Sequence, residues 1–118
     1  MDTKTCYIIS FWLGDRRRDI DIPKYPELQD RLFFLKKHIE LLQSKKHNLT
    51  KIIFNFNIEP DQYHYLSEIY SITPKSLQGT EVEINIRENL GISYGAWSDL
   101  FVKYKTKYDY YVFNEDDY

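Results

Sequence analysis

The sequence predicts an α/β fold: a Rossmann-like, doubly wound parallel sheet of four strands in the order 3-2-1-4, with three helices. Apolar runs and amphipathic stretches alternate strictly along the chain, which favours parallel strands joined by helical crossovers. The first run, residues 6–13, is almost unbroken and indicates a central strand covered on both faces. In the third run Val82, Ile84 and Ile86 alternate with polar residues, which indicates an edge. The length of 118 residues predicts a single domain, 1–118.

The four predicted strands are short runs of apolar, aromatic and β-branched residues. They are Cys6–Leu13, Ile52–Ile58, Val82–Ile86 and Tyr110–Asn114. Because the first is the most apolar and the third the most polar, we place the first near the centre and the third outermost. The winding then reverses between the first and fourth strands, and ligands bind such sheets beyond the carboxyl ends of the strands at that point.

Three amphipathic helices are predicted between the strands. The first begins at Pro26, a residue suited to a first helical turn, and carries apolar residues at three- and four-residue steps. The second spans residues 61–72 and ends before Pro74, with Tyr70 among its inward residues. The third spans residues 93–105 and carries an aromatic stripe.

Composition excludes several classes of function. The net charge of −2 and the pI of about 5.9 provide no basic surface for nucleic acid, so we expect no nucleic-acid partner. A single cysteine, Cys6, excludes an intramolecular disulfide and fits a reducing compartment. The first apolar run is too short to span a bilayer, and no secretory signal precedes it. We therefore expect a cytoplasmic protein without a membrane span.

An acidic cluster follows the last strand. Glu115, Asp116 and Asp117 repel one another, and they become favourable together in a cleft only beside a cation. Hard carboxylate oxygens suit Mg²⁺ or Mn²⁺. The alternative is a solvated acidic tail, as charge runs usually are. We predict a site for one of these two cations.

Three further segments lead to the same edge of the sheet. Gly14 and Asp15 follow the first strand, and Asn55 and Asn57 near the end of the second offer amides suited to a base or ribose. After the third strand, Arg87 supplies donors matched to phosphate, and Gly91 allows a tight turn before a helix. An ordinary turn and a surface ion pair would explain most of the pattern after the third strand equally well.

These segments together resemble the nucleotide-sugar-binding, N-terminal half of glycosyltransferases with the A-type fold (family-2-like). The likeness rests on Gly14-Asp15, on the segment 87–97 with its Asn-x-Gly pattern, and on the strand that ends in Asn114–Tyr118. It implies a truncated A-type fold in which the acidic motif holds a divalent cation against the diphosphate of a nucleotide-activated sugar. Glu115 stands where an aspartate is more usual in that motif.

The resemblance implies a metal-dependent transfer of a sugar to a glycan or other acceptor. The expected metal ligands are Glu115, Asp116 and Asp117. The expected nucleotide-sugar contacts are Gly14, Asp15, Asn57, Arg87, Asn89, Gly91, Tyr94 and Gly95. The family continues into an acceptor-binding half where this chain ends, so no catalytic residue is assigned. We expect little transfer by this chain alone, and association through the uncovered edge of the fourth strand.

A non-catalytic α/β module whose acidic cluster binds a cation or a partner is the alternative. A response-regulator-like module would carry a phosphorylatable aspartate at the end of a middle strand, and residues 54–57 offer none. The sequence also lacks the glycine patterns of dinucleotide-binding and phosphate-loop proteins and any zinc-ligand spacing.

Overall fold

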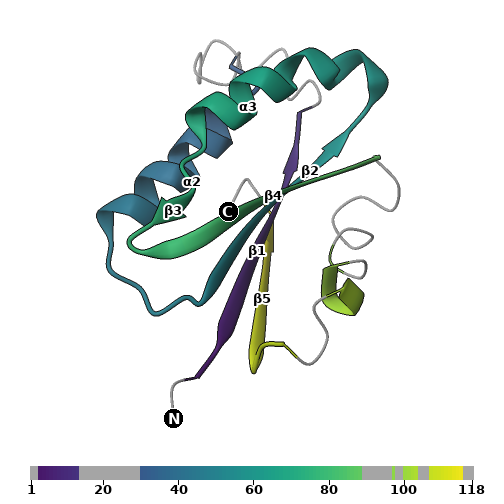
Figure 1. Cartoon of the computed structure of the whole chain (residues 1–118). Helices are drawn as coiled ribbons and strands as arrows, with labels where there is room; N and C mark the ends of the chain where they lie inside the picture. Colours follow the sequence, from purple (N-terminus) through teal and green to yellow (C-terminus); the bar gives the residue numbers. More distant parts are fainter. Residues whose placement is uncertain (1–2, 14–29, 89–96, 98–99, 104–106, 116–118) are drawn as a thin grey trace, which may run out of the picture.

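The computed structural model describes residues 3–13, 30–88, 97, 100–103 and 107–115. Its strands are β1 (Thr5–Trp12), β2 (Lys51–Ile58), β3 (Ser76–Leu77), β4 (Thr80–Glu88) and β5 (Tyr110–Glu115). Its helices are α2 (Phe33–Ser44), the 3₁₀ helix η2 (Pro60–Tyr65) and α3 (Leu66–Ile72). The strands form one sheet in the order β3-β4-β2-β1-β5 (Figure 1).

The central part of the sheet confirms the predicted strand order. The four predicted strands correspond to β1, β2, β4 and β5, and they pair with one another in parallel. β1 lies between β2 and β5, with Ile8 opposite Ile53 on one side and Phe113 on the other. Ile8 and Ile53 are fully buried, as an apolar central strand requires.

A short antiparallel strand makes the sheet mixed, so the prediction of a purely parallel sheet was wrong. β3 pairs with the start of β4 through a two-residue turn. Gln78 and Gly79 occupy the turn with φ angles of 51° and 78°. Two left-handed residues match the twist of a tight hairpin. Leu77 anchors the turn because its side chain is only 1% exposed.

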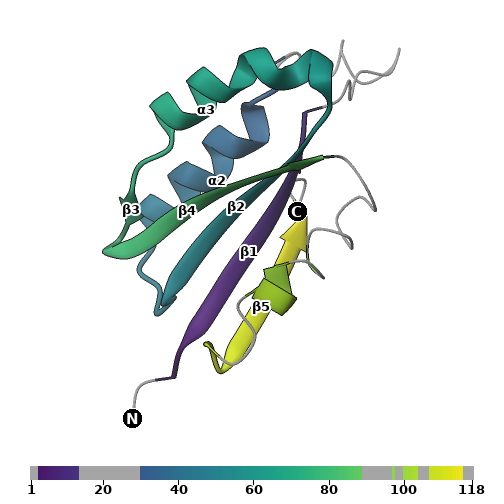
Figure 2. The ribbon, with the colours of Figure 1, turned by 45° about the vertical axis from the view of Figure 1, so that its right-hand side comes forward.

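Helices lie on both faces of the sheet. α2 and α3 cover one face, and the helical segment 100–103 lies against the other (Figures 1 and 2). The first face packs Ile9, Phe11, Phe54 and Phe56 into the larger core. The second face holds a smaller core. That core contains Cys6, Ile8, Ile53 and Leu100, against which Trp97, Tyr108, Tyr111 and Phe113 pack.

The first predicted helix begins later than the sequence suggested. α2 starts at Phe33, because residues 30–32 form a turn, and Pro26 itself lies outside the described residues. The Asp30 carboxylate accepts the backbone N–H of Leu32 at 3.0 Å, so this turn is held locally. Arg31 donates from Nη1 to the carbonyl of Leu13 at 3.0 Å. That bond ties the entry of the helix to the end of β1.

The second predicted helix is present between residues 60 and 72 and ends before Pro74, but two details differ. Its first half is the 3₁₀ helix η2, and α3 forms only from Leu66. Tyr70 was predicted to face inward and is 57% exposed, whereas Ile69 is fully buried. Because the α3 axis is set by Ile69, the adjacent ring turns to solvent. No helix within the described ranges is long and apolar enough to cross a membrane.

Candidate functional site

The carboxyl ends of four parallel strands meet at one edge of the sheet. The chain winds from β1 to β2 and β4 on one side, and β5 then joins β1 on the other side. The reversal of winding therefore falls between β1 and β5, where the ends of neighbouring strands diverge. Ser10 and Glu115 are opposite each other in the β1–β5 register near this point. Glu115 is half-buried at the end of β5.

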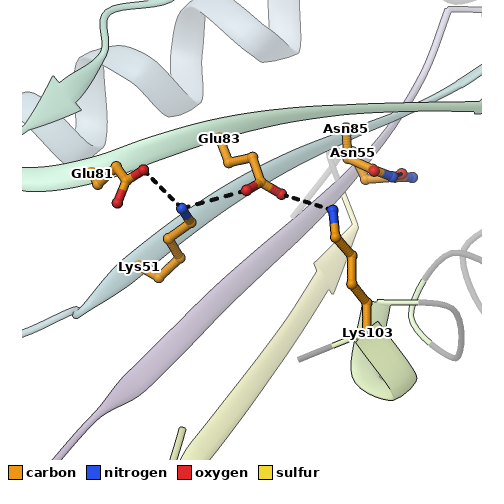
Figure 3. Close-up of polar contacts among 6 residues, drawn as sticks. All are labelled: Lys51, Asn55, Glu81, Glu83, Asn85 and Lys103. Carbon is orange, nitrogen blue, oxygen red and sulfur yellow. Dashed lines mark hydrogen bonds and ion pairs between the residues drawn. The ribbon is translucent and has the colours of Figure 1, made fainter. Parts of the chain in front are cut away.

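Polar side chains from three strands form an amide network on the second face of the sheet. The network consists of Ser10 from β1, Asn55 and Asn57 from β2, and Asn85 from β4. The Asn55 amide donates to Ser10 Oγ at 3.0 Å and to Asn57 Oδ1 at 3.1 Å. Asn85 donates to Asn55 Oδ1 at 2.7 Å, and Figure 3 shows these two side chains next to each other. Parallel register and two-residue alternation place all four residues on one face.

The amide network is deeply buried. Ser10 and Asn57 are 2% exposed and Asn55 is 0% exposed. A buried polar group without a partner costs roughly 1–3 kcal/mol, so each of these groups depends on its neighbours for stability. A fully connected network of this kind also fixes the orientation of every amide in it.

The network ends on a cation. Arg87 of β4 lies opposite Asn57 in the register and donates from Nη1 to Asn57 Oδ1 at 3.2 Å. Asn57 Oδ1 therefore accepts two hydrogen bonds, one from Asn55 and one from Arg87. Arg87 is half-buried, so its guanidinium lies between the buried network and solvent.

An aromatic ring completes the last row of the sheet face. Trp12 lies opposite Asn57 in the β1–β2 register, and its side chain is 39% exposed. Trp12, Asn57 and Arg87 thus form one row across β1, β2 and β4, which we call the edge row. An exposed indole and a guanidinium on either side of a buried amide offer a stacking surface and an anion-binding group.

The end of β5 is fixed by a separate set of bonds. Asn114 donates to the Tyr7 hydroxyl at 3.0 Å, on the opposite face from the amide network. The backbone N–H of Glu115 donates to Asn114 Oδ1 at 3.0 Å. These bonds hold the backbone at the point where the acidic motif begins.

A charged cluster lies at the other end of the same face. Lys51 contacts Glu81 at 3.0 Å and Glu83 at 3.5 Å, and Lys103 contacts Glu83 at 3.6 Å (Figure 3). The Lys51 side chain is only 9% exposed. Burial alone would lower the pKa of Lys51, but the hydrogen bond to Glu81 and the charge of Glu83 raise that pKa overall. This cluster links the segment 100–103 to the sheet.

Cys6 lies near this cluster, and its thiol stays protonated at neutral pH. Its side chain is fully buried, and burial raises the pKa of its thiol to about 11 even though the Lys51 charge acts in the opposite direction. A thiol in this state supplies almost no thiolate nucleophile at neutral pH.

A hollow of about 820 Å³ opens at the amino ends of the strands and is separate from the edge row. Its lining includes Lys4, His47, Thr50 and Thr80. Its lining brings together an amine, an imidazole, hydroxyls and amides, and it lies at the opposite end of the strands from the reversal of winding. We therefore do not assign it to the candidate site.

Three of the residues predicted for the site fall within the described ranges. Asn57 and Arg87 are brought into direct contact, and Glu115 lies at the end of β5, across β1 from β2. The remaining predicted residues lie outside those ranges: Gly14, Asp15, Asn89, Gly91, Tyr94, Gly95, Asp116 and Asp117. Within the described part of the chain, no group of three or more His, Cys, Asp or Glu side chains is placed to hold a metal ion.

Three residues near the site were not predicted from the sequence as site residues. They are Trp12, Ser10 and Asn85, which join it through the pairing of strands far apart in the sequence. A signal was present in the second strand, because polar residues buried within an otherwise apolar strand need hydrogen-bond partners. Comparison with known proteins gives no match to any family model, curated protein or solved structure.

Proposed function

We propose that this protein binds a nucleotide-diphosphate sugar at the carboxyl edge of its sheet, as the donor domain of a metal-dependent glycosyltransferase with the A-type, Rossmann-like fold. The observation that carries the proposal is the edge row beside the reversal of winding. An exposed indole, a buried amide and a guanidinium lie there in register on three adjacent strands.

The chemistry of the edge row suits the two ends of a nucleotide. A nucleobase stacks on an exposed aromatic ring, and such stacking contributes about 1–3 kcal/mol per base in nucleic-acid complexes. Trp12 provides such a ring. The planar guanidinium of Arg87 presents donors that match phosphate oxygens. Arg87 and Trp12 are both in register with Asn57 of the intervening strand β2, which places cation and ring on the same face.

The proposed metal ligands are the carboxylates that follow β5. Glu115 ends this strand, and Asp116 and Asp117 continue the motif. Carboxylate oxygens fit Mn²⁺ or Mg²⁺, and the cation when bound neutralises charge on the diphosphate leaving group. Gly14, Asp15, Asn89, Gly91, Tyr94 and Gly95 complete the proposed nucleotide-sugar site. A glycan or another acceptor would receive the sugar, in the cytoplasm.

The test compares one cation inside the edge row with one outside it. Arg87→Gln removes the proposed phosphate contact, whereas Lys103→Gln removes a cation from the charged cluster at the opposite end of the face. We expect Arg87→Gln to weaken binding of uridine or guanosine diphosphate at least tenfold by calorimetry with Mn²⁺ present, and Lys103→Gln to leave it unchanged. Equal affinities of wild type and Arg87→Gln would contradict the assignment of Arg87 to phosphate.

The same titration separates the proposal from a non-catalytic module. A protein that binds Mn²⁺ but neither nucleotide would support the cation-binding alternative. Binding of one nucleotide over the other would identify the base that the site accepts.

A further inference from the structure

We propose that the outer edge of β4 binds the C-terminus of an extended peptide, which adds a strand to the sheet and places its last side chain in a pocket beside α3. The proposal is independent of the proposed nucleotide site and uses none of the residues assigned to it. It follows from the open hydrogen-bonding groups of β4, from the lining of the pocket and from the charge of Lys75.

The outer edge of β4 is paired only near its start. β3 pairs with the first two residues of β4, and the next N–H, that of Val82, donates to the Lys75 carbonyl at 2.9 Å. Beyond Val82, no strand of the described chain lies on this side of β4 (Figures 1 and 2). Backbone groups alternate in direction along a strand, so the N–H and C=O groups of Ile84 and Ile86 point away from β2, as the N–H of Val82 does. An added strand can pair with these open donors and acceptors.

A pocket of about 240 Å³ adjoins this edge on the first face of the sheet. Its lining consists of Tyr70, Thr73, Pro74, Lys75, Val82 and Ile84. The Ile84 side chain packs at the margin of the larger core and is half-buried. Residues opposite each other on paired strands point to the same face, so a peptide residue opposite Ile84 brings its side chain to the pocket. The Tyr70 ring is 57% exposed there, and an apolar side chain in the pocket would cover it.

The charge of Lys75 selects the end and the direction of the peptide. Lys75 is exposed at the pocket and forms no ion pair within the described residues. It lies beside Val82, near the start of β4. A peptide that runs antiparallel to β4 and ends opposite Ile84 directs its terminal carboxylate toward Lys75, whereas a parallel peptide brings its ammonium group there. Opposite charges attract and like charges repel, so charge complementarity favours the antiparallel peptide with a free C-terminus.

The position of Ile86 adds a second preference. A peptide residue opposite Ile86 stands two residues before the peptide's end, and its side chain lies on the same face as the last one. Ile86 is half-buried at the margin of the larger core, so an apolar neighbour extends that core. The expected ligand therefore ends in an apolar residue, any residue and a final apolar residue with a free carboxylate.

The experiment uses defined peptides, two variants and one control. The probes are short peptides of alternating valine and threonine, labelled with fluorescein at the amino end. They end in leucine or alanine after a threonine, and each is made with a free carboxylate and with a carboxamide. Lys75→Gln removes the proposed carboxylate contact, and Tyr70→Ala removes one exposed wall of the pocket. Lys37→Gln makes the same change of charge at an exposed position on α2 and serves as the control. Fluorescence anisotropy measures affinity, and circular dichroism confirms that each variant is folded.

The expected results separate the contribution of each feature. The wild type should bind the leucine peptide with a free carboxylate at least tenfold more tightly than its carboxamide. Lys75→Gln should abolish that difference, Tyr70→Ala should reduce the preference for leucine over alanine, and Lys37→Gln should change neither. Failure of the wild type to bind the leucine peptide, or a preference for the carboxylate that persists in Lys75→Gln, would overturn the proposal.

Hydrogen exchange in the wild type tests the same edge without a variant. In the free protein the backbone amides of Ile84 and Ile86 should exchange faster than that of Asn85, which points toward β2. The leucine peptide should slow the two fast amides. Slow exchange at every protein concentration would show that the edge is already covered, and slowing only as concentration rises would assign it to a second copy of the chain. Either result would overturn the proposal.

Discussion

At the scale of single residues, the feature with the largest effect on stability is the burial of polar side chains in the second face of the sheet. Asn55 is fully buried at a position where β2 could have carried another isoleucine. Such a residue is tolerated because each of its polar atoms has a partner, and removing it would leave those partners unsatisfied.

Asn55→Ala should therefore reduce the free energy of unfolding by about 3 kcal/mol, because Ser10, Asn57 and Asn85 all lose a hydrogen-bond partner. Urea denaturation measures the change. Asn48→Ala, at an exposed position, serves as the control and should change stability by less than about 0.5 kcal/mol. A loss below about 1 kcal/mol for Asn55→Ala would show that water satisfies the network when Asn55 is absent.

The buried thiol gives a pH dependence with a defined sign. The pKa of Cys6 rises from 9.0 to about 11 in the folded protein, so the unfolded chain loses the thiol proton first as pH rises. The contribution of Cys6 to stability is therefore complete below pH 9 and is lost between pH 9 and 11. The slope is at most about 1.4 kcal/mol per pH unit.

Urea unfolding from pH 8 to pH 11 should show stability falling more steeply in the wild type than in Cys6→Ala. Lys51, whose pKa is also raised above its ordinary value of 10.5, contributes to both proteins at the top of this range. Parallel profiles for wild type and Cys6→Ala would mean that the thiol ionises as readily in the folded chain as in the unfolded one.

At the scale of elements, local sequence patterns predicted the strands, which depend on hydrophobic periodicity. They missed the helix start and the hairpin, which depend on side-chain hydrogen bonds and turn residues. Unbroken and alternating apolar runs correctly located β1, β2, β4 and β5. The first helix was predicted too early because Pro26 suits a helix start, whereas the Asp30 side chain holds the turn before Phe33. The β3–β4 hairpin was missed because its strand has only two residues and its signal is the Gln78-Gly79 pair.

The β3–β4 hairpin requires a left-handed backbone conformation at Gly79. Gly79 has a φ of +78°, and an added Cβ would meet no atom within 4 Å. Gly79→Ala should therefore cost about 1–2 kcal/mol through backbone strain alone. Thermal and urea unfolding measure this, with Ser76→Ala at the exposed start of β3 as the control. Unchanged stability in Gly79→Ala would show that the turn relaxes to another type.

At the scale of the whole molecule, strand order was predictable because the polarity of each strand reports how central it is. The site was only partly predictable. Arg87 and Asn57 were predicted from the chemistry of their own side chains. Trp12 and Ser10 join them only through strand pairing across about forty-five residues of sequence, which no local pattern encodes.

The outer edge of β5 is a second feature that concerns the whole molecule, because another chain could pair with it. In the described part of the chain β5 pairs only with β1, and Tyr110 and Val112 are 63% and 42% exposed. An exposed apolar strand at a sheet edge invites pairing with another chain. Sedimentation should show concentration-dependent association, and Val112→Lys should reduce it. Monomeric wild type at several hundred micromolar would contradict the prediction.

The central claim, a cation-dependent nucleotide site at the carboxyl edge, is tested most directly by one calorimetric titration. Uridine and guanosine diphosphate are titrated into the wild type with Mn²⁺ and again with a chelator, and the double variant Glu115→Gln and Asp117→Asn is titrated in parallel. We predict binding of one nucleotide that weakens at least tenfold on chelation and to the same extent in the double variant. Binding that is unaffected by chelation and by the double variant would contradict the claim.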